Sequence, residues 1–113
     1  MSPDEGAPTV EPQVDLTVVT LMFDTSDVVA LLSVLARYVV VSRGHEGCRN
    51  IDLCASVTVT GRVVVIEKWA TPDAQRAHFD SRDMVRMAEE VRPFLTAAPS
   101  IDLLEPVSAH DLS

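Results

Sequence analysis

The chain has 113 residues, 47% of them hydrophobic, and carries 17 acidic against 9 basic residues for a formal net charge of −8. This length predicts one domain with a modest core, and the acidic balance excludes functions that depend on attraction to nucleic acid or anionic lipid. No apolar run approaches the roughly 20 residues that cross a bilayer, and the N-terminus does not resemble a secretion signal. We therefore expect a soluble, cytoplasmic protein with no nucleic-acid or membrane partner.

The first third of the chain predicts a tail, a strand and a helix. Residues 1–13 combine proline, glycine and acidic residues with few apolar side chains, so we expect them to be disordered. Residues 14–23 are rich in Val, Leu and Thr, which predicts a strand. Asp27 is a suitable helix cap, and the apolar residues after it recur at helical spacing until Arg43-Gly44.

The middle of the chain predicts a hairpin of two strands. Residues 48–57 and 62–69 are rich in β-branched and apolar residues, and Thr60-Gly61 between them suits a tight turn. Cys48 and Cys54 are six residues apart, so on one regular strand they would share a face about 20 Å apart. We expect both to be buried thiols that cannot form a disulfide with each other.

The last third predicts two helices and a final strand. Thr71 precedes a short helix over residues 72–80, and Ser81 precedes a longer one that Pro93 ends. Residues 100–107 read as a strand. The final residues, 108–113, predict a loose tail.

This order of elements predicts an α+β domain over residues 14–107. The sequence β-α-β-β-α-β is the ferredoxin-like arrangement, in which a four-stranded antiparallel sheet carries both helices on one face. Apolar residues occupy both faces of the predicted strand at 62–69, Val63 and Val65 on one and Val64 and Ile66 on the other. The uncovered face is thus apolar, which predicts a homodimer formed by two-fold pairing of sheets.

The candidate site lies where the third strand passes into the short helix. Glu67 and Trp69 are two residues apart and share a strand face. His78 shares a helix face with Ala74 and Ala77, which turns it inward. If Glu67 and Trp69 face the helices, all three border one cavity, where burial would shift the proton affinities of the carboxylate and the imidazole. Such groups can take a proton from a phenol or enol.

The walls of this predicted pocket are apolar: Met84, Met87, Leu35 and Val65. Structural roles are open for the same residues. Glu67 could bind backbone groups or an arginine, Trp69 could fill the core, His78 could bond a carbonyl, and the methionine stripe is common in plain cores.

At these positions the chain resembles the antibiotic biosynthesis monooxygenase family of dimeric α/β barrels. The resemblance spans roughly residues 14–107 and rests on the following features: Ser42-Arg43 with Glu46-Gly47-Cys48, Glu67-x-Trp69, Ala74, His78, Ser81 and Leu104-x-Pro106. It implies a ferredoxin-like homodimer whose sheets form a joint barrel, with a pocket in each subunit. It also implies cofactor-independent monooxygenase chemistry, in which the deprotonated substrate itself reduces dioxygen.

Two positions depart from branches of this family. Val65 stands where the polyketide-quinol oxygenases have a functional asparagine, four residues before the tryptophan. Ala88 stands where the heme-degrading branch has its axial histidine, ten residues beyond His78. The sequence contains no phosphate-binding glycine fingerprint, no Cys-x-x-Cys and no histidine pair at ligand spacing, so we expect neither cofactor nor metal.

The leading hypothesis is a cofactor-independent monooxygenase of small phenolic, quinol-type or polyketide-like substrates. In it, His78 accepts a proton, Trp69 positions the substrate and Glu67 tunes His78 or the substrate hydroxyl. The main alternative is a non-catalytic dimeric barrel that binds a small hydrophobic metabolite. Heme degradation and isomerisation of a sugar phosphate are further alternatives, and the isomerase would need inward-pointing arginines, for which the candidates are Arg37, Arg43, Arg76 and Arg86.

Overall fold

The computed structural model describes residues 16–108, which form one sheet with helices on one side. The sheet has four antiparallel strands in the spatial order β2-β3-β1-β4. Their bounds in chain order are Thr17–Asp24 for β1, Cys48–Ala55 for β2, Arg62–Trp69 for β3 and Ser100–Leu104 for β4. The predicted tail at 1–13 lies outside the described residues, as does all but Ser108 of the tail at 108–113.

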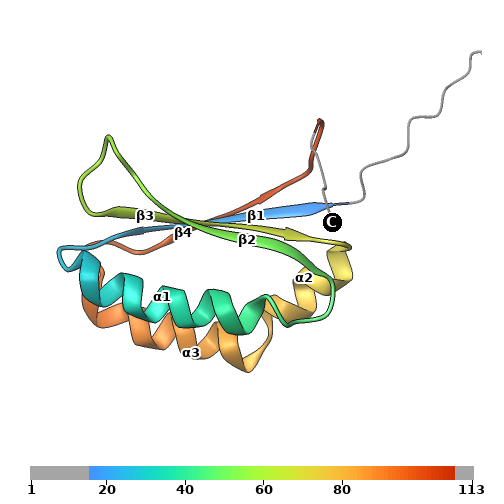
Figure 1. Ribbon diagram of the computed structural model, residues 1–113, viewed down its shortest axis with the longest axis horizontal. Helices are drawn as coiled ribbons and strands as arrows, with labels where there is room; N and C mark the ends of the chain where they lie inside the picture. The colour runs from blue at the N-terminus through green and yellow to red at the C-terminus, as the bar shows by residue number, and fades with distance from the viewer. Residues whose placement is uncertain (1–15, 109–113) are drawn as a thin grey trace, which may run out of the picture.

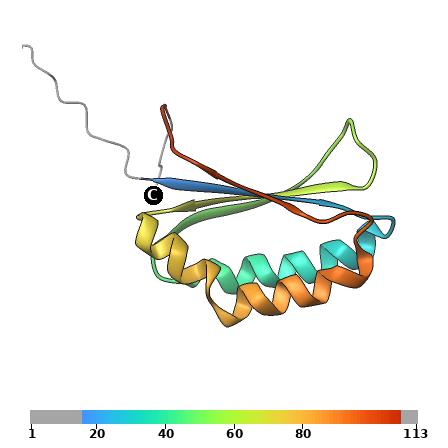
Figure 2. The ribbon, with the colours of Figure 1, turned by 180° about the vertical axis from the view of Figure 1, so that it is seen from behind.

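Three α-helices and one short 3₁₀ helix complete the domain. Their bounds are Val28–Ser42 for α1, Pro72–Phe79 for α2, Arg82–Val91 for α3 and Arg92–Phe94 for the 3₁₀ helix η1. Both ribbon views place α1 and α3 side by side beneath the sheet, with α2 at one end, and leave the opposite face of the sheet uncovered (Figures 1 and 2). The predicted ferredoxin-like α+β fold is therefore confirmed.

The helix starts follow the predicted capping residues. The side chains of Asp27, Thr71 and Ser81 accept hydrogen bonds from backbone N–H groups three residues ahead, which satisfies donors that have no partner within the helix. Two strands are shorter than predicted, since β2 ends at Ala55 and β4 at Leu104. Pro106 has no N–H to donate, which is consistent with the early end of β4.

The core forms where the sheet faces α1 and α3. Along β3 the buried residues alternate regularly, with Val63, Val65, Glu67 and Trp69 buried toward the helices. The neighbouring strand β1 alternates in the same way. Because side chains on a strand point alternately to opposite faces, the β3 residues between these four lie on the uncovered face.

The prediction that Cys48 and Cys54 share a buried face is wrong. The pairing of β2 with β3 shifts register between Cys48 and Asn50, and an irregularity of this kind changes which face the next residues occupy. Cys48 therefore lies opposite Trp69 on the helix side, whereas Cys54 lies opposite Val64 and is exposed. Both thiols are free, as expected.

Among residues 16–108, no helix combines the length and the apolar character needed to cross a bilayer.

Candidate active site

The end of β3 places a carboxylate and an indole inside the protein. Glu67 is 2% exposed and Trp69 is fully buried. The Trp69 Nε1–H donates a hydrogen bond of 3.0 Å to Glu67 Oε1. The condition set by the sequence is met, because this face of β3 is the helix side. The strand therefore places a carboxylate in the core, and one of its oxygens accepts a hydrogen bond from a residue of the same strand.

Two further side chains meet this carboxylate from the helices. The Tyr38 hydroxyl, from α1, donates to Glu67 Oε2 at 2.5 Å and lies 2.7 Å from His78 Nε2. His78, from α2, stacks on Trp69 with ring centroids 4.4 Å apart and an interplanar angle of 28°. The buried face of α2 consists of His78 and Gln75. Glu67, Tyr38, Trp69 and His78 form what we call the polar cluster.

Burial dominates the proton affinities of the polar cluster. It raises the pKa of Glu67, although hydrogen bonds from Tyr38 and Trp69 oppose this. It lowers the pKa of His78 from 6.5 to about 4, and His45 adds to that decrease. Burial and the nearby Glu67 carboxylate raise the pKa of Tyr38 above its ordinary value of 10. At neutral pH His78 is thus an uncharged imidazole that can accept or pass on a proton.

A close contact between backbone segments holds α2 against the sheet. Gly47 has φ of +80°, and a Cβ added there would lie 2.4 Å from the Cβ of Ala74. The Ala70 N–H donates to the Gly47 carbonyl at 2.7 Å. Glycine at one position and a small residue at the other therefore allow the α1–β2 turn and the first turn of α2 to touch, which fixes His78 over Trp69.

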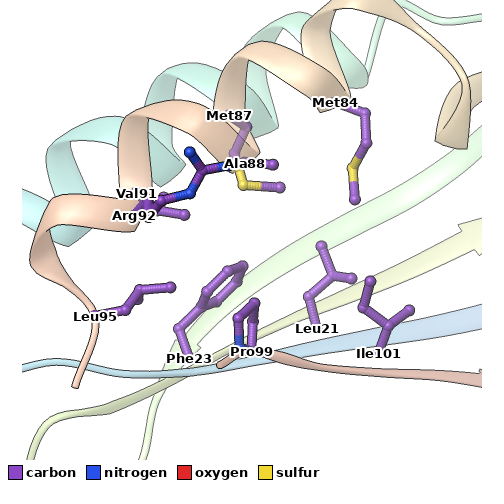
Figure 3. Close-up of a pocket in the computed structure, with 10 residues that line it drawn as sticks. All are labelled: Leu21, Phe23, Met84, Met87, Ala88, Val91, Arg92, Leu95, Pro99 and Ile101. Atoms are coloured by element: carbon purple, nitrogen blue, oxygen red, sulfur yellow. The ribbon is translucent and has the colours of Figure 1, made fainter. Parts of the chain in front are cut away.

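An apolar cavity of about 200 Å³ lies beside the polar cluster, between α3 and the sheet. Figure 3 shows Met84 and Met87 extending from α3 toward Leu21, Phe23 and Ile101. The remaining lining residues are Ala88, Val91, Arg92, Leu95 and Pro99. A cavity of comparable size lined by aliphatic and aromatic side chains holds a benzene-sized ring.

Met84 connects the cavity to the polar cluster. Its side chain lines the cavity, and its sulfur lies 3.5 Å from the Tyr38 oxygen. Of the four predicted pocket walls, Met84 and Met87 line this cavity. Leu35 and Val65 are fully buried core residues outside its lining. Glu67, Trp69 and His78 also lie outside its lining and are packed against one another.

Among the residues of this region that the sequence analysis did not predict are Tyr38 and Arg92. Tyr38 occupies the same helical face as Leu31 and Leu35, at i+7 and i+3, so its inward position could have been read from the spacing. Arg92 lines the cavity but sits where α3 passes into η1. No periodic pattern applies at such a junction.

The structure also shows where the residues lie that a sugar-phosphate isomerase or a heme-degrading enzyme would need. The four arginines considered for a sugar phosphate, Arg37, Arg43, Arg76 and Arg86, are all exposed, and none lines the cavity. Ala88 faces the cavity with a methyl group, so it offers no ligand to an iron atom. Within residues 16–108 no group of three or more His, Cys, Asp or Glu side chains is arranged to hold a metal ion.

The chain resembles known proteins in both sequence and structure. The model of the antibiotic biosynthesis monooxygenase family matches residues 17–90. Rv0793 from Mycobacterium tuberculosis is 25% identical, with a TM-score of 0.77 over 84% of this chain and 98% of that one. SnoaB, a cofactor-independent oxygenase from Streptomyces nogalater, is 19% identical, with a TM-score of 0.75 over 84% and 96% of the two chains. No curated protein matches the chain by sequence.

Proposed function

Because the chain belongs to the antibiotic biosynthesis monooxygenase family, we propose that it is a cofactor-independent monooxygenase that uses dioxygen to oxidise a small phenolic or quinol-type substrate. One observation carries this proposal. An apolar cavity large enough for one aromatic ring shares Met84 with a buried cluster of proton-accepting groups. The name of SnoaB, a cofactor-independent oxygenase of the same fold, is consistent with it.

The cavity and the polar cluster would divide the work. The apolar lining of the cavity binds the aromatic ring, and its size favours a single ring over a larger polyketide-like substrate. A phenol whose hydroxyl reaches past Met84 meets the Tyr38 oxygen and, beyond it, His78 Nε2. Removal of the phenolic proton leaves an electron-rich anion, which reduces dioxygen directly.

Within the polar cluster each residue has a distinct role. His78 is the proton acceptor, because its lowered pKa keeps it neutral at physiological pH. Glu67 tunes His78 through Tyr38, which lies within hydrogen-bond distance of both. Trp69 positions these groups, since it stacks on His78 and donates to Glu67.

Dioxygen uptake with a panel of substituted hydroquinones tests the proposal. We expect uptake above the buffer rate with the wild type, a fall of about 10²-fold or more for His78→Ala, and a similar fall for Tyr38→Phe. Arg76→Ala is the matched control, because Arg76 is on the exposed side of the same helix as His78. Equal uptake by the wild type and His78→Ala would remove His78 from the mechanism.

A second candidate is a non-catalytic protein that binds a small hydrophobic metabolite. It is favoured by the closed state of the polar cluster, in which Trp69 is fully buried and His78 stacks directly on it. A filled space around Trp69 is typical of a structural role. Saturable binding of hydroquinones without dioxygen uptake by any of them would favour this function over catalysis.

We also propose that the functional unit is a homodimer formed through the uncovered face of the sheet. Apolar side chains from three strands lie on this face: Val18 and Met22 from β1, Val64 and Ile66 from β3, and Leu104 from β4. Half-exposed apolar residues on one continuous face are typical of a protein interface. A second copy related by a two-fold axis would cover them.

Light scattering measures this assembly directly. We expect the wild type to have the mass of two chains and Ile66→Glu, which places a charge in the centre of the face, to have the mass of one. Val29→Glu is the control, because it adds the same charge at an exposed position of α1. A wild-type monomer at micromolar concentration would contradict the dimer.

A further inference from the structure

The polar cluster continues toward the surface through two residues that have no role in the proposal above. His45, in the turn between α1 and β2, places its Nδ1 2.8 Å from His78 Nδ1. Its other ring nitrogen, Nε2, lies 2.8 Å from Oδ2 of Asp83, in the first turn of α3. One unbroken series of hydrogen bonds therefore joins Asp83, His45, His78, Tyr38 and Glu67, and we call this series the hydrogen-bond chain.

The hydrogen-bond chain runs from solvent to the core. The side chains of His45 and Asp83 are 23% and 27% exposed, whereas those of His78 and Glu67 are each 2% exposed. Its two ends thus differ in their access to water. A proton can enter or leave at His45, while Glu67 exchanges protons only through its hydrogen-bonded neighbours.

The donors and acceptors of the hydrogen-bond chain fit a first proton arrangement, in which Glu67 is ionised. Tyr38 has a single hydroxyl proton, which it donates to the Glu67 carboxylate, so His78 Nε2 must carry the proton shared with the Tyr38 oxygen. A neutral His78 then accepts at Nδ1 from His45 Nδ1–H. In this arrangement His45 also donates from Nε2 to the Asp83 carboxylate, so both of its ring nitrogens carry a proton.

A second arrangement has the same number of protons. If each of the three inner protons moves one link toward the core, His45 gives its Nδ1 proton to His78, His78 gives its Nε2 proton to Tyr38, and Tyr38 gives its own to Glu67. No covalent bond between heavy atoms changes and no electron is transferred. The result is a neutral His45, the other tautomer of His78, an intact Tyr38 hydroxyl and a protonated Glu67.

We propose that this hydrogen-bond chain is a proton relay, in which His45 and Asp83 exchange protons between solvent and the buried Tyr38–Glu67 pair. Its use in turnover rests on the proposed function, because Tyr38 lies behind the cavity lining, with its oxygen 3.5 Å from the sulfur of the lining residue Met84. From the second arrangement, Tyr38 takes a proton from a substrate and passes its own to His78 Nε2, His78 passes its Nδ1 proton to His45, and His45 releases a proton to solvent. His45 is then the proton exit, and Asp83 is a positioning residue that holds its ring.

The surroundings of the relay suit proton transfer. Burial raises the pKa of Glu67 and lowers that of His78, so the carboxylate gains proton affinity and the imidazole loses it relative to water. The relay draws its titratable groups from both the helices and the sheet, with Tyr38 on α1, Asp83 on α3 and Glu67 on β3. One further titratable group, Cys48 on β2, lies near Glu67.

Glu67→Gln changes the buried end of the relay, and its effect is measured at the two histidines toward the other end. The Trp69 N–H donates to Oε1 of residue 67, so the amide oxygen of the glutamine must take that position and its NH₂ group must face Tyr38. Tyr38 then accepts from the amide and donates to His78 Nε2. His78 is forced into its Nδ1–H tautomer, and His45 must accept at Nδ1 and become neutral.

Nitrogen NMR of ¹⁵N-histidine-labelled protein measures these states, because protonated and bare ring nitrogens have well-separated shifts. The sequence has three histidines, of which His45 and His78 belong to the relay and His110 does not. In the wild type we expect the Nε2–H tautomer at His78. Glu67→Gln should convert it to the Nδ1–H tautomer, with the proton shared by the two histidines carried on His78 Nδ1 instead of His45 Nδ1.

Two control variants show whether the effect travels along the relay. Glu90→Gln removes the same charge from an exposed ion pair with Arg37 and should leave both histidines in their wild-type states. In Tyr38→Phe, which breaks the relay between Glu67 and His78, adding Glu67→Gln should no longer change the His78 tautomer. An unchanged His78 tautomer in folded Glu67→Gln would overturn the proposal.

Turnover gives an independent reading. Where hydroquinone oxidation is measurable, His45→Ala should lower kcat about tenfold with little change in KM, and added imidazole should restore part of the rate. A lowered kcat that imidazole does not restore would contradict proton exit through His45. If no substrate is oxidised, the proposed function fails while the NMR comparison still decides whether the relay exists.

Discussion

The space between the sheet and the helices has two ends with opposite character. At one end the polar cluster fills it, with Trp69 fully buried and Tyr38, Glu67 and His78 bonded to one another. At the other end an apolar cavity of about 200 Å³ remains open under α3. One end thus holds ionisable groups in a dry, close-packed setting, and the other offers room for a ligand.

The difference arises from which side chains the two ends receive. Tyr38 and Trp69 are large and meet across the layer, whereas the cavity end receives the small Ala88 from α3. Strand β4, at the edge of the sheet, is exposed along its whole length. A site that removes a proton from an apolar substrate needs both ends. Met84 joins the two ends, because its side chain lines the cavity and its sulfur contacts the Tyr38 hydroxyl.

The largest expected effect is the loss of stability when the filled end is emptied. Trp69→Ala should lower the free energy of unfolding by about 3–5 kcal/mol, because it leaves a cavity beneath His78 and removes the donor to Glu67. Urea denaturation measures this. Trp69→Phe, which keeps an aromatic ring against His78, should cost less. A cost below about 1 kcal/mol for Trp69→Ala would contradict close packing at this end.

The second effect is a loss of stability at acid pH, which arises from the polar cluster and not from the cavity. In the unfolded chain His78 binds a proton below about pH 6.5, whereas in the folded protein it does so only near pH 4. The unfolded state therefore holds the extra proton in this window, and stability should fall by at most about 1.4 kcal/mol per unit as pH decreases from 6.5 to 4. Above pH 6.5 this stabilising contribution is fully present.

Glu67 acts with the opposite sign, because its raised pKa makes the folded state take up a proton more readily than the unfolded state as pH falls. The difference in slope between the wild type and His78→Gln therefore isolates His78. We expect the wild type to lose more stability than His78→Gln over the same window. Equal slopes in urea titrations between pH 6.5 and 4 would show that the His78 pKa is not lowered.

The comparison of the two ends also shows how far sequence alone reaches. Strand alternation predicted that Glu67 and Trp69 share a face but not which face, because β3 is apolar on both, whereas helix periodicity predicted the inward position of His78. The contact of Tyr38 with Glu67 was not predictable, because it depends on α1 lying over β3, and residues 29 apart in sequence carry no shared pattern. Three of the four residues of the polar cluster were therefore predicted, but Tyr38 and the hydrogen bonds that join the four were not.

Features that depend on irregular backbone were beyond the sequence patterns. The register shift after Cys48 changes the face of every following residue of β2, and nothing in the alternation marks it. His45 and Asp83 belong to a turn and to the first turn of a helix. The close contact between Gly47 and Ala74 holds the α1–β2 turn, which carries His45, against α2, the helix that precedes α3 and Asp83. Local periodicity contains no information on such contacts.

The smallest expected change in stability, combined with a large change in binding, comes from filling the cavity. Ala88→Leu adds apolar volume at the cavity wall and should change the free energy of unfolding by less than about 1.5 kcal/mol in either direction. Calorimetric titration with a hydroquinone should show at least tenfold weaker binding. The pH dependence of stability should stay as in the wild type, because the polar cluster is untouched.

Ala36→Leu is the matched control, since it makes the same substitution at an exposed position of α1 outside the cavity lining. It should bind the hydroquinone as tightly as the wild type. If Ala88→Leu also binds normally, the ligand does not occupy the cavity beneath α3. The substrate would then have to enter the polar cluster itself, which requires the stacked rings of Trp69 and His78 to separate, and the division of the interior into a binding end and a proton-accepting end would be lost.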